Sequence, residues 1–199
     1  MEKRLENFII KIITFIITLI LIAFIYLTFS ESKYAFIYYY ILLVPVFLYF
    51  IYRKLKMHLS IFILFNLFFI MHVAGGGLYF NGIRLYDIYF SFLRYDNIVH
   101  FFGSFIVVLL LFNLISIFLN QQKKYSNLCL FFILLLMTIG IGTVIELLEL
   151  IGVLFFNASK SVGDYLNNVL DLFFNMLGAL IGSLFTIFFY KKKFFKKLI

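Results

Sequence analysis

Polar side chains recur at helical spacing within the last long apolar segment of the chain, residues 161–183. On a helix that turns about 100° per residue, one stripe about 80° wide holds Asp164, Asn168, Asp171, Asn175, Gly178 and Gly182. A carboxylate at membrane depth costs about 3 kcal/mol, so it normally faces a protein interior and has partners there. Asp171 therefore needs partners from other segments of the chain.

Two further segments carry pairs of ionisable residues at helical spacing. Asp96 and His100 are four residues apart, and Glu146 and Glu149 are three apart, so each pair shares one helix face. Imidazole suits zinc, iron or manganese, and carboxylates suit harder cations. These groups indicate a divalent-metal site that activates water. The simpler interpretation is a hydrogen-bonded polar cluster that fixes helix packing without a ligand.

The composition indicates a membrane protein. The chain has 199 residues, of which 65% are hydrophobic and 13% charged, and its mean hydropathy is +1.10. Globular proteins contain about 25% charged residues. The net charge of +8 does not indicate a nucleic-acid partner, because the basic residues cluster in short segments beside apolar runs. The single cysteine, Cys129, excludes an intramolecular disulfide.

Apolar runs of membrane-spanning length predict an all-α, polytopic bundle of about six transmembrane helices. They cover about residues 8–29, 34–52, 59–73, 97–119, 128–150 and 164–190. Residues 75–96 are too polar and glycine-rich to span but too aromatic for a solvated loop, so we expect an interfacial or re-entrant segment there. The glycines at 75–77 predict a bend. No internal repeat is evident, and we expect one integral membrane domain over 1–199.

The distribution of basic residues predicts the orientation. Six spans put both termini on one side, where twelve basic residues flank the spans, against four on the other side. The four are Lys33, Arg84, Arg94 and Lys160. This asymmetry favours a multi-pass protein of the cell membrane, inner or plasma, with both termini cytoplasmic. The ionisable residues of the third to sixth spans then meet at one outward-facing level, and they stay together even if the orientation is inverted.

Several of these residues have simpler interpretations. Asp164 follows Gly163 at the start of a helix, where an aspartate typically caps the helix, and the same argument applies to Asp96. His72 fits either an interfacial histidine hydrogen-bonded to a backbone carbonyl or a member of the site. Gly178 and Gly182 are spaced for helix contact.

The two arginines outside the basic clusters allow three interpretations, of which ordinary anchoring at the membrane interface is the simplest for either one alone. Arg84 is placed to pair with Asp87 and Arg94 with Asp96. Alternatively, either guanidinium meets a lipid phosphate or pyrophosphate.

Three stretches, YDNIVHFFGSF, IELLEL and GDYLNNVLDLFFNMLGALIG, resemble the motifs of the bacterial YjdF-like inner-membrane proteins. The resemblance covers about residues 70–183, includes an H-x-x-GG stretch at His72, and leaves the first two spans outside. More distantly, the chain is similar to VanZ-like proteins. The resemblance implies family motif positions for Asp96, His100, Glu146, Glu149, Asp164, Asp171 and Asn175. It implies no reaction, because the YjdF-like family has no established activity.

Three classes of function fit these patterns. The first is a metal-assisted enzyme acting on a lipid or lipid-linked substrate of the bilayer. Its candidate catalytic residues are His100, Glu146 and Asp171, its candidate substrate-binding residues Arg84, Arg94 and Asn175, and its candidate metal ligands His100, Glu146, Glu149, Asp164 and Asp171, with His72 and Asp96 as further candidates. The second class is a proton- or cation-coupled transporter. The third is a non-catalytic protein with a structural polar cluster. The sequence predicts no particular oligomeric state.

Overall fold

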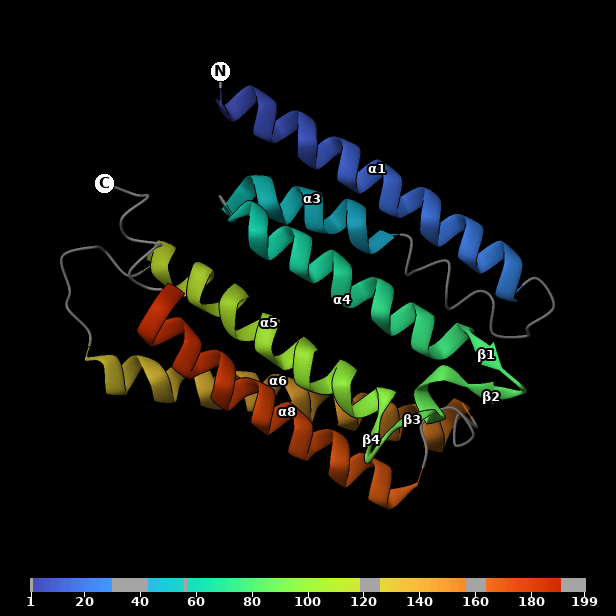
Figure 1. The fold of residues 1–199 in the computed structure, drawn as a ribbon. Coiled ribbons are helices and arrows are strands. Elements are labelled where there is room, and N and C mark those ends of the chain that lie inside the picture. Colours follow the sequence, from blue (N-terminus) through green and yellow to red (C-terminus); the bar gives the residue numbers. More distant parts are fainter. Residues whose placement is uncertain (1, 30–42, 56, 119–125, 157–163, 191–199) are drawn as a thin grey trace. The chain divides into compact units, whose positions relative to one another are not determined.

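The protein is described by a computed structural model covering residues 2–29, 43–55, 57–118, 126–156 and 164–190. The described residues are predominantly helical, which confirms the predicted all-α class (Figure 1). The chain forms two compact units, Met1–Ile88 and Tyr89–Ile199, called unit 1 and unit 2 below. Each unit has its own packed helices. The single domain expected over 1–199 stays a prediction.

The described residues of unit 1 form three helices. They are α1 (Glu2–Phe29), α3 (Leu43–Leu55) and α4 (Leu59–Gly77). Ile17 and Leu21 of α1 pack against Val73 of α4, which buries the apolar stripe that their helical spacing predicts. Helices α1 and α4 are long and apolar enough to cross a membrane, as expected for the first and third spans. Helix α3 forms the end of the second predicted span, whose residues 34–42 lie outside the described residues.

The three glycines at 75–77 do not form the predicted bend. Helix α4 continues through them and ends at Gly77. Their role is steric, because a Cβ atom at Gly75 would lie 2.6 Å from the ring of Tyr86. The absence of a side chain at Gly75 therefore lets the following segment pack directly on the helix.

Residues 78–94 form two short β-hairpins. The first pairs β1 (Tyr79–Phe80) with β2 (Ile83–Arg84), followed by the 3₁₀ turn η1 (Leu85–Asp87), and the second pairs β3 (Tyr89–Phe90) with β4 (Leu93–Arg94). Each hairpin has a two-residue loop that needs positive φ angles, supplied by Asn81 (52°) and Gly82 (79°) in the first and Ser91 (63°) in the second. The segment forms hairpins and no helix long enough to span, and its predicted interfacial or re-entrant position stays a prediction.

In unit 2 the structure describes three long helices and a π-helical turn. They are α5 (Tyr95–Phe118), α6 (Asn127–Phe156), α8 (Tyr165–Phe185) and η2 (Thr186–Tyr190). Each of the three helices is long and apolar enough to cross a membrane, which gives five such helices among the described residues. Helix α5 begins two residues earlier than predicted, and α6 continues six residues further.

Helices α5 and α8 approach each other closely along the glycines of α8 (Figure 1). A Cβ atom at Gly178 would lie 2.1 Å from the carbonyl oxygen of Phe101, and one at Gly182 would lie 3.2 Å from the backbone of Phe105. The predicted helix contact at these glycines is confirmed. Val108 of α5, Leu134 of α6 and Ala179 of α8 form part of a buried apolar core. The polar stripe of α8 is thereby held against α5.

Candidate His/carboxylate metal site

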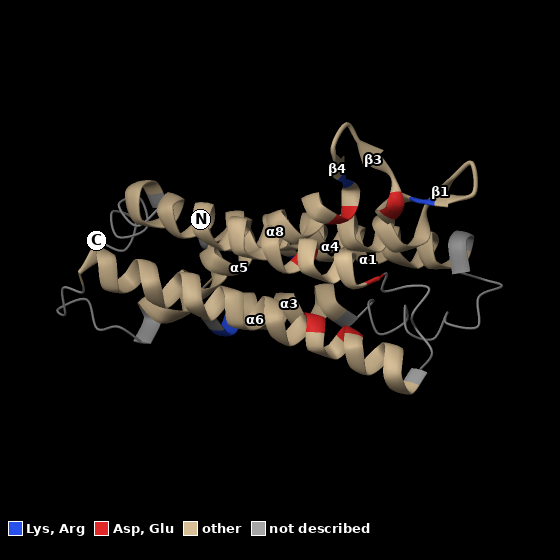
Figure 2. Ribbon diagram, turned by 90° about the horizontal axis from the view of Figure 1, so that it is seen from below, with Lys and Arg blue, Asp and Glu red and all other residues tan. Residues whose placement is uncertain are grey.

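Asp96, His100, Glu146 and Asp171 form a cluster inside unit 2, called the His/carboxylate cluster below. The acidic segments of α5, α6 and α8 lie toward the same end of this unit (Figure 2). Both nitrogens of the His100 ring face carboxylate oxygens. Glu146 and Asp171, which are 46 and 71 positions from His100 in the sequence, thus meet it at one imidazole, as the predicted order of spans implies.

The Nε2 side of His100 faces two aspartates. Nε2 lies 3.5 Å from Asp96 Oδ1 and 3.6 Å from Asp171 Oδ1. One ligand atom from each of these residues lies within 4.8 Å of the other two. Distances of 3.5–3.6 Å are too long for good hydrogen bonds. They are close to the separation of about 3.4 Å between two ligands of a tetrahedral metal ion bound at about 2.1 Å.

Asn167 donates hydrogen bonds to both Asp96 and Asp171. Its Nδ2 donates to Asp171 Oδ2 at 2.6 Å and to Asp96 Oδ2 at 3.4 Å. Its Oδ1 accepts from the guanidinium of Arg94, which fixes the amide with its NH₂ group toward the carboxylates. Each aspartate therefore uses Oδ2 for the amide and turns Oδ1 toward His100.

The Nδ1 side of His100 faces Asn175 and Glu146. Nδ1 lies 3.3 Å from Asn175 Oδ1, which also accepts from Ser104 Oγ at 2.8 Å. Asn175 Nδ2 donates to Glu146 Oε1 at 3.4 Å. Because the amide NH₂ group faces an acceptor, its oxygen must face His100, and Nδ1 must carry a proton. Nε2 is then the ring atom available to a metal, as in sites where the other nitrogen is fixed by a hydrogen bond.

Two buried carboxylate oxygens in the cluster accept no hydrogen bond from any residue that the structure describes. They are Asp171 Oδ1 and Glu146 Oε2, and their side chains are 1% and 7% exposed. Three ionised carboxylates and one protonated imidazole would together carry a charge of −2, which is costly in an apolar bundle. A divalent cation bound between Asp96, His100 and Asp171 would replace the proton on Nε2, reduce the net charge of the cluster to −1 and give Asp171 Oδ1 a partner.

The two remaining acidic candidates have different positions. Asp164 is the N-cap of α8, where its Oδ1 accepts from the backbone N–H of Asn167 at 2.9 Å, so the predicted cap is confirmed. Glu149 is half-buried one turn beyond Glu146. Neither belongs to the set of ligand atoms that converge within 4.8 Å in the described part of the chain.

The predicted cap at Asp96 is wrong. Asp96 is the second residue of α5, and its carboxylate is directed to His100. The start of α5 is stabilised by Asn97 instead, whose Oδ1 accepts from the backbone N–H of Arg94 at 3.1 Å.

Two further candidate residues, Arg84 and His72, lie in unit 1. Arg84 Nε pairs with Asp87 Oδ2 at 3.0 Å, as one sequence interpretation expected. Arg94, in unit 2, contacts Asn167, which sequence reasoning did not anticipate. His72 Nδ1 lies 2.5 Å from Tyr86 Oη, which also donates to the carbonyl of His72 at 3.0 Å. A role for His72 in the site stays a prediction.

Sequence reasoning missed Asn167, Ser104 and Tyr86. It assigned Asn168 to the polar stripe of α8, but the structure buries Asn167 and leaves Asn168 half-buried. The missed signal is the spacing of Asn167, Asp171 and Asn175, which are four residues apart and therefore follow one helix face.

The comparisons with known proteins concern the family alone. The sequence model of the family described as Predicted membrane protein (DUF2238) matches residues 10–192. The match is consistent with the resemblance to YjdF-like proteins, but it is longer than the 70–183 inferred from motifs and includes the first two spans. No curated protein and no solved structure matches the chain.

Proposed function

Since the chain belongs to the DUF2238 family of predicted membrane proteins, we propose that it is a metal-assisted membrane enzyme built around the His/carboxylate cluster. Its substrate would be a lipid or a lipid-linked molecule in the bilayer that surrounds the helices. The metal ligands would be Asp96 Oδ1, His100 Nε2 and Asp171 Oδ1.

One observation carries this proposal. Asp171 Oδ1 is buried in an apolar helix bundle without a hydrogen bond, and it faces the same point as His100 Nε2. Asn167 accounts for the other oxygen of each aspartate. A polar cluster that only stabilises helix packing would be expected to satisfy its buried oxygens within the protein.

The chemistry of the donor set supports hydrolysis. Three protein ligands leave a coordination position for water, as in catalytic zinc sites, and the bound metal lowers the pKa of that water. Glu146 Oε1 lies 3.6 Å from His100 Nδ1, on the side of the ring away from the proposed metal, so in this proposal Glu146 would stabilise and orient His100. His100 lies about 8 Å along α5 from Tyr95, at about the depth of lipid head groups if α5 crosses the membrane. The charge asymmetry of the sequence favours the outer leaflet of the cell membrane, with cytoplasmic termini.

Metal content tests the proposal directly. The detergent-purified protein is dialysed against Zn²⁺ or Mn²⁺ and its bound metal is measured by elemental analysis. We expect about one ion per chain in the wild type and almost none in Asp171→Asn. Asp164→Asn is the matched control, because it removes a carboxylate from the same helix and keeps a good N-cap residue. Equal metal content in wild type and Asp171→Asn would contradict the site.

Activity is tested on the same preparations. Release of inorganic phosphate from a polyprenyl pyrophosphate is expected in the metal-loaded wild type and in Asp164→Asn. It should be lost in Asp171→Asn. Metal binding without any activity on phosphate-bearing or ester-bearing lipids would leave the metal site standing and refute the enzyme.

A proton-coupled transporter is the second candidate, and buried hydroxyl groups favour it. Thr138, Ser183 and Thr186 continue the buried faces of α6 and α8 away from the cluster, and within the described structure their hydroxyl oxygens have no hydrogen-bond partner. The hydroxyls of four other helix residues donate to the carbonyl four positions earlier, namely Thr14, Thr18, Ser116 and Thr143. Hydroxyls without such a partner are suited to hold water molecules, which conduct protons.

Proton uptake by proteoliposomes separates the two candidates. A transporter would acidify vesicles containing a pH-sensitive dye under an imposed membrane potential, and Asp171→Asn or Thr138→Val would reduce the rate. The metalloenzyme predicts no uptake above that of empty vesicles and normal metal content in Thr138→Val.

A further inference from the structure

The two hairpins between α4 and α5 are copies of one pattern. Residues 78–87 read LYFNGIRLYD and residues 88–96 read IYFSFLRYD, so the second copy lacks one residue. The strand registers agree, because Tyr79 pairs with Arg84 and Tyr89 pairs with Arg94. The expectation that the chain has no internal repeat is therefore wrong here. The copies are short, and the one-residue deletion shifts their alignment.

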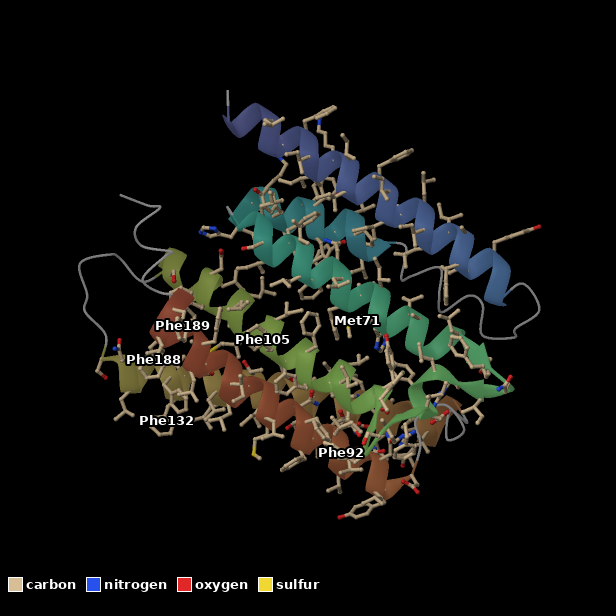
Figure 3. All side chains as sticks on the ribbon, viewed as in Figure 1. Met71, Phe92, Phe105, Phe132, Phe188 and Phe189 are labelled. Atoms are coloured by element: carbon tan, nitrogen blue, oxygen red, sulfur yellow. The ribbon has the colours of Figure 1, made fainter. Side chains whose placement is uncertain are left out.

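Both copies expose large apolar side chains. More than half of the surface of each of six residues is exposed, namely Tyr79, Phe80, Ile83, Tyr89, Phe90 and Phe92. Phe92, in the loop of the second hairpin, is 82% exposed (Figure 3). Scattered exposed apolar residues are ordinary, but a patch repeated in two successive hairpins marks an interaction surface.

The position of the hairpins in the chain indicates the partner. Helix α4 ends at Gly77, two residues before β1, and α5 begins at Tyr95, directly after β4. Both helices are apolar enough to cross a membrane, so the hairpins start and finish at the ends of spans. Aromatic residues are typical of this level of a membrane protein. Exposed aromatic side chains at this level are therefore suited to contact with lipid.

We infer that both hairpins insert their aromatic side chains into the lipid–water interface, on the side of the membrane where α4 ends and α5 begins. The backbone supports this, because paired strands satisfy their own N–H and C=O groups in a region poor in water. The two-residue loops keep the polar backbone at the tips short. The inference does not depend on the metal site, since it rests on the exposed side chains alone.

Tryptophan fluorescence tests the inference, because the chain contains no tryptophan. Phe80→Trp and Phe92→Trp each place a single probe on one hairpin, at exposed positions where the larger ring has room. Each variant is reconstituted into phosphatidylcholine vesicles containing lipid brominated either near the head group or near the end of the acyl chain. Leu136→Trp, on the exposed face of α6 well inside its span, is the deep control.

We expect both hairpin probes to be blue-shifted relative to tryptophan in water and to be quenched most by shallow bromines. The Leu136→Trp probe should be quenched most by deep bromines, which also shows that the reconstituted protein is inserted. Emission at the wavelength found in water, with strong quenching by aqueous iodide, would refute the inference for that hairpin. A blue-shifted probe that no brominated lipid quenches would also refute it, because the side chain would then be covered by protein.

Discussion

The two histidines at the ends of α4 and α5 occupy contrasting environments. His72 in unit 1 is exposed, and its Nδ1 meets the hydroxyl of Tyr86, whose neighbours Arg84 and Asp87 form their own ion pair. His100 in unit 2 is largely buried and faces three carboxylates. Each histidine is accompanied by a Tyr-Asp pair from one copy of the hairpin repeat. The same sequence pattern therefore accompanies two different histidine environments.

The two copies differ in the partners of their aspartates. Asp87 is paired with the arginine of its own hairpin, so its charge is balanced locally. Asp96 is the second residue of a long helix, which places it one turn from His100 and beside the polar stripe of α8. The arginine of that copy, Arg94, contacts Asn167. In the first copy the aspartate is paired within its own repeat. In the second copy Asp96 lies in the His/carboxylate cluster with residues of other helices.

The largest expected effect distinguishes the two histidines directly. His100→Gln should weaken binding of Zn²⁺ by more than about 100-fold, because even residues that only orient ligands account for about 10–100-fold. His72→Gln should leave the affinity unchanged. Titration of the purified variants with a fluorescent zinc chelator as competitor measures both. A comparable loss in His72→Gln would show that both histidines serve one site.

Replacing glycine by alanine should destabilise the protein more at Gly178 than at Gly75. Gly178→Ala forces a Cβ against the backbone carbonyl of Phe101, which cannot move without separating α5 from α8. We expect a loss of about 1–3 kcal/mol or more in stability. Gly75→Ala meets the ring of Tyr86, a side chain that can rotate away, so its cost should be smaller. Thermal unfolding in detergent compares the two variants. Equal destabilisation would contradict the assignment of α5–α8 as the rigid contact.

Much of the fold follows from sequence because the membrane imposes a simple rule. Apolar runs of sufficient length gave five of the spans, and the spacing of Gly178 and Gly182 gave the helix contact. The same rule applies to the site: an acidic residue in an apolar helix needs partners, and His100, Glu146 and Asp171 do meet. Metal binding at this meeting point stays a prediction.

The remaining details depend on tertiary contacts that no local pattern encodes. Asn167 and Asn168 are chemically identical neighbours, and only the rotation of α8 against α5 decides which amide is buried. The glycines at 75–77 predict a bend from the sequence alone. In the structure the helix continues through them and Tyr86 packs against Gly75. Nothing in the local sequence distinguishes Ser104, whose hydroxyl donates to Asn175 Oδ1 on the facing helix.

Asn167 provides the next test, because it acts on the metal site only through its hydrogen bonds. Asn167→Leu keeps the branched shape of the side chain and removes the donor to Asp96 and Asp171, so zinc affinity at the proposed site should fall about 10–100-fold. Asn168→Leu is the matched control on the same turn of α8 and should change affinity little. A reversed result would favour the stripe that the sequence predicted and contradict the observed rotation of α8.

The smallest effect is expected in unit 1. Tyr86→Phe removes the hydroxyl that contacts both Nδ1 and the carbonyl of His72, and should cost about 0.5–1.5 kcal/mol of stability, near the lower limit because His72 is exposed. Tyr79→Phe, which alters an exposed tyrosine of the same hairpin, is the control and should cost less. Thermal unfolding gives the difference, and elemental analysis should show unchanged metal content in both. Loss of metal in Tyr86→Phe alone would mean that Tyr86 and His72 do more than attach the first hairpin to α4, and that the contrast between the two histidines is incomplete.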